Sequence, residues 1–104
     1  MVPTRDGPDG LAELLLYEST ATYRRIEWSP TLQLLHCTLM VEEHRGWDCR
    51  IDLSACGLTW GRWMRAPLFL LSPEPAYQEV GLDRSVPVWA GRVFGEARIV
   101  EYYR

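Results

Sequence analysis

The sequence predicts an α+β fold: a mainly antiparallel, curved or barrel-like sheet of about five or six strands with about one or two short helices. Two observations lead to this prediction. Runs of β-branched, aromatic and aliphatic residues of strand length recur from residue 21 to the end of the chain. The segments between these runs are too short for the crossover helices that parallel strands require. An all-β barrel is the alternative.

The N-terminal residues are predicted to be a flexible arm, and the rest a single globular domain. Residues 1–10 contain two prolines, two glycines and two aspartates, a composition typical of loops. Residues 11–104 are long enough to bury one hydrophobic core. Within them, the spacing of Leu11, Leu14 and Leu15 slightly favours a short helix over residues 11–20, capped by Asp9 or Gly10. A strand beginning at Glu13 is nearly as consistent with the pattern.

The clearest prediction is a β-hairpin over residues 31–53. Residues 21–28 are predicted to form a strand that ends at the Ser29–Pro30 turn, and the next strand covers residues 32–41. Both faces of this second strand are apolar, which is typical of a central position in a sheet. After a charged turn, residues 47–53 alternate strictly between apolar and polar side chains. The predicted buried set is Trp47, Cys49, Ile51 and Leu53, and the exposed set is Asp48, Arg50 and Asp52.

The C-terminal half is predicted to contain further strands and one helix. Residues 59–65 fit either a strand or a helix, and residues 66–71 fit a buried strand in which Pro67 lies at an edge or bulge. Ser72 as cap, Pro73 in the first turn and Gly81 as stop predict a short helix between them. Residues 86–94 and 97–103 are strand candidates, and glycines at positions 91 and 95 predict a bend.

Charge and hydropathy exclude several classes of protein. The net charge is −3, whereas nucleic-acid binders usually carry a basic stripe. No apolar run reaches the length needed to span a bilayer, and the first residues do not resemble a secretion signal. We therefore expect a cytoplasmic protein that binds neither nucleic acid nor membrane.

The residues that usually carry catalysis or bind metals do not form recognisable motifs. Three cysteines exclude a complete set of disulfides, and they are predicted to be free, buried thiols, with Cys56 the likeliest exception. The two histidines and three cysteines lack metal-site spacings, so we expect no metal and no cofactor. An enzyme that uses His36 or Glu27 as general base is the last of the three functional hypotheses.

Aromatic residues provide the main functional signal. Five tryptophans, five tyrosines and two phenylalanines in 104 residues are more than a small core readily buries, and exposed aromatics and arginines are typical of recognition surfaces. The sequence therefore predicts a non-enzymatic binding module with an aromatic-lined pocket or groove for a small apolar or charged aromatic ligand. The alternative is a protein-interaction or inhibitor-type domain, and we also expect a homodimer. The candidate ligand-binding residues are Trp60, Arg62, Trp63, Arg65, His36 and Trp89.

Overall fold

The computed structural model describes residues 7–21, 27–29, 31 and 33–103, with only the backbone of residues 27–29. This part of the chain forms seven strands, one α-helix and one short 3-10 helix. The strands are β1 (Gly10–Leu16), β2 (Glu27–Ser29), β3 (Leu34–Glu42), β4 (Arg45–Asp52), β5 (Trp63–Leu70), β6 (Val86–Trp89) and β7 (Val93–Tyr102). The helices are η1 (Glu18–Thr20) and α1 (Pro73–Val80).

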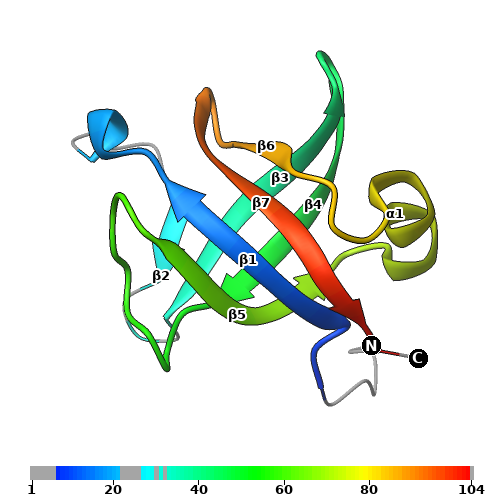
Figure 1. Cartoon of the computed structure of the whole chain (residues 1–104), viewed down its shortest axis with the longest axis horizontal. Coiled ribbons are helices and arrows are strands. Elements are labelled where there is room, and N and C mark those ends of the chain that lie inside the picture. The colour runs from blue at the N-terminus through cyan, green and yellow to red at the C-terminus, as the bar shows by residue number, and fades with distance from the viewer. Residues whose placement is uncertain (1–6, 22–26, 30, 32, 104) are drawn as a thin grey trace.

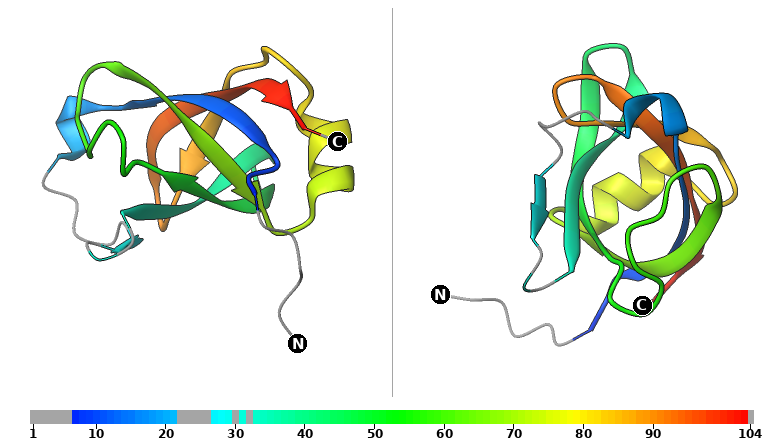
Figure 2. Two further views of the ribbon diagram at one scale, coloured as in Figure 1. Left: turned by 90° about the horizontal axis from the view of Figure 1, so that it is seen from below. Right: turned by 90° about the vertical axis from the view of Figure 1, so that its left-hand side faces the viewer.

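The strands form a closed antiparallel barrel (Figure 1). The sheet order is β2-β3-β4-β5-β1-β7-β6. Besides pairing with β7, β6 also pairs with β3, and this pairing closes a ring of six strands. This closing seam is short: it pairs Thr38 with Trp89 and Leu39 with Val88. β2 pairs only with β3 and lies outside the ring (Figure 2). The predicted barrel-like antiparallel sheet is therefore confirmed, and its helical content is small enough to fit the all-β alternative.

The prediction of a helix over residues 11–20 is wrong, because residues 10–16 form β1 in the centre of the sheet. β1 pairs with β5 on one side and with β7 on the other. Its interior face carries Ala12, Leu14 and Leu16, which are all buried. Leu11 and Leu15 on the outer face are half-buried, so both faces are apolar and the alternation typical of strands is hidden. The extended conformation of residues 10–16 is decided by their pairing with β5 and β7, which are distant in the sequence.

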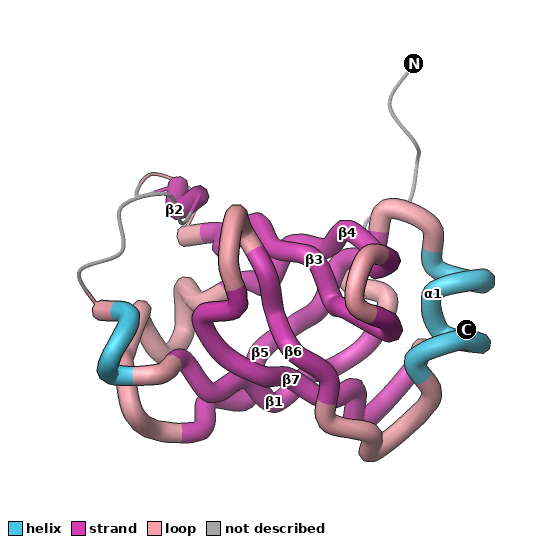
Figure 3. The backbone as a smooth tube through the Cα atoms, turned by 90° about the horizontal axis from the view of Figure 1, so that it is seen from above, coloured by secondary structure: helices cyan, strands magenta, loops and turns pink. Residues whose placement is uncertain are grey.

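The interior of the barrel is filled with apolar side chains. Each strand of the ring contributes alternate residues to the core, and Phe94 of β7 is the largest fully buried side chain among the described residues. α1 covers one end of the barrel (Figure 3) and buries Ala76 and Val80, which lie one turn apart on its inner face. The centre of the ring is therefore a packed hydrophobic core.

The hairpin prediction is confirmed, with two corrections in its second strand. β3 and β4 pair directly, and Cys49, Ile51 and Leu53 are buried. Trp47 is only partly buried, because it lies beside α1, where its indole N–H donates a hydrogen bond to Glu79 Oε1 at 3.0 Å. On the opposite face, Asp48 and Arg50 are exposed, whereas Asp52 is half-buried.

The remaining boundaries differ from the predicted ones in places. The strand predicted at residues 21–28 corresponds to β2 at residues 27–29, and residues 22–26 lie outside the described residues. The last two strands meet at a turn around Gly91, which has a positive φ of 84°, whereas Gly95 lies inside β7. Of the predicted arm, residues 1–6 lie outside the described residues. Asp9 accepts a hydrogen bond from the Leu70 amide at 2.7 Å.

α1 follows the predicted signals closely. Ser72 occupies the N-cap position, Pro73 is the first helical residue, and Gly81 ends the helix with a φ of 74°. Glycine adopts this left-handed conformation without a steric penalty. Tyr77 of α1 stacks on Tyr102 of β7 with ring centroids 4.0 Å apart, which links the covering helix to the barrel wall.

Candidate functional site

A row of charged side chains crosses the outer face of β5, β1 and β7. Glu13 of β1 lies opposite Arg65 of β5 and Arg98 of β7 in the strand register. Glu13 Oε2 lies 2.8 Å from Arg65 Nη2, and Glu13 Oε1 lies 2.7 Å from Arg98 Nη2. We call these three residues the Glu13 ladder. Trp63 borders it, since the Arg98 guanidinium carbon lies 5.3 Å from the centre of the indole ring.

We expect the Glu13 ladder to make the stability of the protein depend on pH. Hydrogen bonds from Arg65 and then Arg98 lower the pKa of Glu13 below its usual value of about 4.3. A lowered folded-state pKa stabilises the protein above the unfolded-state pKa, and this stabilisation is lost as the pH falls through the folded-state value.

We therefore expect Glu13→Gln to be less stable than the wild type at neutral pH, because the variant lacks the charge that both arginines bind. The difference should shrink below about pH 4 as Glu13 of the wild type becomes protonated. Urea unfolding of both proteins from neutral to acid pH measures this. A difference in unfolding midpoint that stays constant over the whole range would contradict the role assigned to the ladder.

The two tryptophans of the segment 59–67 lie in different environments. Trp60 precedes β5 and is partly buried against the core, and Gly61 after it has a positive φ of 79°. The Gly61 amide donates a hydrogen bond to Leu16 O at 2.7 Å, which fixes this segment to the end of β1. Arg62 is exposed. Trp63 begins β5 and points outward with 44% of its surface exposed.

Truncating these two tryptophans should have unequal effects on stability. Trp60→Ala is expected to lower the free energy of unfolding by about 2–3 kcal/mol, because it removes partly buried core contacts. Trp63→Ala should cost less than about 1 kcal/mol, mainly the contact with Arg98. Chemical denaturation of both variants measures the difference. Equal losses would mean that Trp63 packs as part of the core.

The other predicted site residues lie on a different side of the barrel. Trp89 ends β6 and pairs with Thr38 of β3, and His36 lies two residues before Thr38 on the same outer face. In the ring, β6 is separated from β5 by β1 and β7 on one side and by β3 and β4 on the other. Trp63 and Arg65 therefore do not share a site with His36 and Trp89. The side chain of Glu27 does not belong to the described part of the structure.

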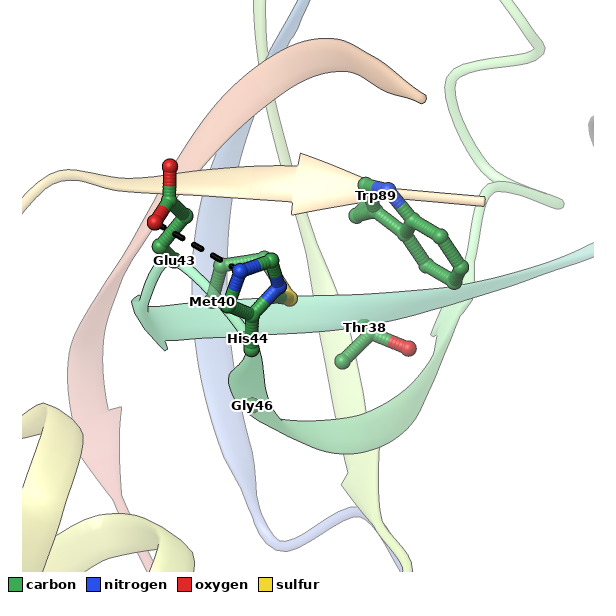
Figure 4. A pocket seen from close by; sticks show the side chains of 6 residues that line it. All are labelled: Thr38, Met40, Glu43, His44, Gly46 and Trp89. Atoms are coloured by element: carbon green, nitrogen blue, oxygen red, sulfur yellow. Dashed lines mark ion pairs between the residues drawn. The ribbon is translucent and has the colours of Figure 1, made fainter. Parts of the chain in front are cut away.

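A hollow on the outer surface lies beside Trp89 (Figure 4). We call it the Trp89 hollow, and its volume is about 280 Å³. It lies between Trp89, at the end of β6, and the part of the β3–β4 hairpin that extends past the start of β6, with the indole on one side and the hairpin residues on the other. Its lining residues are Thr38, Met40, Glu43, His44, Gly46 and Trp89.

The hairpin residues of the hollow are held by local contacts. Thr38 Oγ1 donates to Asp48 Oδ1 at 2.8 Å, across the β3–β4 pair. A Cβ atom added to Gly46 would lie 2.6 Å from the Leu39 carbonyl oxygen, so the close strand approach requires glycine here. Glu43 and His44 at the tip are almost fully exposed, with Glu43 Oε1 and His44 Nε2 3.5 Å apart.

The described residues include no cluster of three or more His, Cys, Asp or Glu side chains placed to hold a metal ion. In the same residues, every buried side-chain nitrogen and oxygen has a hydrogen-bond partner. His36 is half-buried on the outer face of β3, at the register position opposite Arg50.

The chain matches no known protein family, curated protein or solved structure. Its function therefore has to be inferred from the chemistry of its own surface. No helix within the described residues is long and apolar enough to cross a membrane.

The cysteine prediction is confirmed at two positions and wrong at the third. Cys37 and Cys49 are free and buried, as predicted for small apolar side chains. Cys56 is free but exposed, because it lies in the turn that precedes Gly57. Gly57 has a φ of 75°, and its amide donates a hydrogen bond to Leu53 O at 2.7 Å, which closes this turn.

Sequence reasoning identified Trp89 but missed the other walls of the hollow. Thr38 and Met40 belong to the outer face of the strand predicted at residues 32–41, and His44 lies in the charged turn that follows it. His44 is almost fully exposed. The available signal was the shared face of His36, Thr38 and Met40, but only barrel closure brings Trp89 beside it.

Proposed function

We propose that this protein is a non-enzymatic protein-interaction module that holds a basic side chain of its partner in the Trp89 hollow. The observation that carries the proposal is the exposed indole of Trp89, 42% accessible at the wall of a hollow whose rim bears the carboxylate of Glu43. The described residues give no support to a ligand pocket inside the barrel, because their apolar core side chains fill the ring.

The size of the hollow suits a single side chain. Its volume of about 280 Å³ is close to the lower limit of about 300 Å³ that is usual for pockets enclosing drug-sized ligands. One arginine or lysine side chain of a partner fits such a volume. Interfaces often bind through a few anchors of this kind, set in pockets and surrounded by weaker contacts.

The chemistry of the lining favours a cation with an apolar stem. The indole face of Trp89 attracts a cation through its quadrupole, and the Met40 thioether provides apolar, adaptable contact for methylene groups. Glu43 supplies a negative charge at the rim, and the whole chain carries a net charge of −3. Basic partners would thus be attracted at long range as well as at the hollow.

The test uses the side-chain N–H signals of the tryptophans in a two-dimensional NMR spectrum of ¹⁵N-labelled protein. The Trp89 signal is assigned by its loss in Trp89→Phe. Titration with a capped Gly-Arg-Gly peptide should shift this signal with a dissociation constant of about 1 mM or weaker, while the Trp63 signal stays in place. Glu43→Gln should weaken the response several-fold.

Capped Gly-Glu-Gly and Gly-Leu-Gly peptides serve as matched controls. A shift of the Trp89 signal with the leucine peptide alone would show that the hollow prefers an apolar side chain, and it would overturn the proposal of a basic one. A shift only with a free aromatic compound such as naphthalene sulfonate would restore the small-ligand hypothesis. Equal shifts at Trp63 and Trp89 would indicate non-specific contact and contradict the proposed site.

A further inference from the structure

Two buried thiols face each other across the β3–β4 pair. Cys37 and Cys49 are direct partners in the strand register, and their Sγ atoms lie 3.5 Å apart. The exposed fraction of each residue is small, at 6% for Cys37 and 4% for Cys49. Both thiols belong to the hydrophobic core, so they are in contact with each other and shielded from bulky reagents.

The position of the pair suits a covalent bond between the two sulfurs. Directly opposed residues in antiparallel strands have Cα atoms about 4.5–5.5 Å apart, and disulfides span Cα separations of about 4.4–6.8 Å. The sulfurs need to move closer by about 1.5 Å to reach the bonding distance of about 2 Å. Side-chain rotation within the existing hairpin supplies this movement, and the strands keep their register.

We propose that Cys37 and Cys49 form an oxidative modification site, at which a small peroxide converts the thiol pair into an intramolecular disulfide. This inference stands independently of the proposed binding function. The geometry that supports it is the cross-strand register together with the contact between the sulfurs.

The reaction with hydrogen peroxide has two steps. In the first, one sulfur, as the thiolate, attacks a peroxide oxygen; the O–O bond breaks, a sulfenic acid forms, and hydroxide leaves and takes up a proton as water. In the second, the neighbouring sulfur attacks the sulfenic sulfur; the S–S bond forms, the S–O bond breaks, and a second water leaves. Two thiols and one peroxide thus become one disulfide and two waters, with sulfur oxidised and peroxide oxygen reduced.

The surroundings make the reaction slow and selective for small oxidants. The adjacent Cys37 thiol and then burial raise the pKa of the Cys49 thiol well above its usual range, and the thiolate is the reactive form. Cys56, by contrast, is exposed. An exposed thiol without a neighbouring cysteine is expected to form overoxidised or intermolecular products instead.

The experiment uses Cys56→Ser, which keeps the buried pair and removes the exposed thiol. The native variant is incubated with hydrogen peroxide, quenched with catalase, unfolded and alkylated, and its intact mass is measured. We expect a monomer that has lost the mass of two hydrogen atoms and takes up no alkyl group, with full recovery of both alkylation sites after reduction. Its melting temperature should rise by roughly 5 °C or more relative to the reduced form.

Tryptic mapping of the wild type under non-reducing conditions provides a second measurement that depends on no substitution. Cleavage after Arg45 and Arg50 places the three cysteines on three different peptides. The Cys37 and Cys49 peptides should stay joined until reduction. Cys37→Ala in the Cys56→Ser background is the matched control and should form no intramolecular bond.

Two results would overturn the proposal. The first is full alkylation of both Cys37 and Cys49 after a peroxide treatment many times longer than the one that oxidises Cys56 of the wild type. The second is a mass gain from added oxygen at either sulfur with no linked peptide.

Discussion

Replacing Phe94 with alanine is expected to lower the free energy of unfolding by about 3–5 kcal/mol. Phe94 has no exposed surface and is the largest fully buried side chain of the described residues. Its truncation leaves a cavity in the middle of a closed ring, where the paired strands on both sides prevent collapse into the space. Urea unfolding of the variant and the wild type measures the loss.

Tyr103→Ala is the matched control for this change, because it also removes a large aromatic side chain. Tyr103 is 44% exposed, so its loss is expected to cost less than about 1 kcal/mol. Where Phe94→Ala fails to fold, Phe94→Leu keeps most of the apolar volume and should show a smaller loss. A cost below that of Tyr103→Ala would contradict the packed core.

Gly95→Ala is expected to destabilise the protein by about 3 kcal/mol, although it adds only one methyl group. Gly95 lies inside β7 between β1 and β6. A Cβ atom there would lie 2.3 Å from the Leu15 carbonyl oxygen and 3.1 Å from Val88 Cγ2. Because the first of these atoms belongs to the backbone of the neighbouring strand, relief of the clash requires the strands to separate.

Gly7→Ala makes the same chemical change where an added Cβ atom meets nothing within 4 Å. Its effect on the melting temperature should be close to zero, whereas Gly95→Ala should lower it by roughly 10 °C or more. Equal melting temperatures for the two variants would show that β1 and β7 are not held as close together as the structure indicates.

The sequence predicts an element well where the hydrophobic pattern of that element alone decides its conformation. Residues 47–53 bury most of one face and expose most of the other, so the alternation of apolar and polar residues predicted β4 and most of its buried side chains. The prediction for β1 was wrong because Leu11 and Leu15 on its outer face are also apolar. The conformation of β1 depends on hydrogen bonds to β5 and β7. The hydrophobic pattern of residues 10–16 alone does not indicate these partners, which are distant in the sequence.

The same distinction applies to the candidate sites. Trp63 and Arg65 alternate with buried residues in β5 and share its outward face, as a strand over this segment requires. Their ionic and aromatic partners, Glu13 and Arg98, come from two other strands. The neighbours of Trp89 likewise follow from the closing seam. The predicted homodimer stays a prediction.

The two-residue seam between β3 and β6 has a consequence for the folding pathway. β3, β4 and β5 form one unit of sequence neighbours, and β6 and β7 form a hairpin; β1 joins the two through long pairings. The seam adds only two residue pairs between segments about fifty residues apart in the sequence. Closing so long a loop for so few contacts is entropically unfavourable until the rest of the sheet has formed. Ring closure should therefore come after the transition state, and weakening the seam should accelerate unfolding while leaving the folding rate almost unchanged.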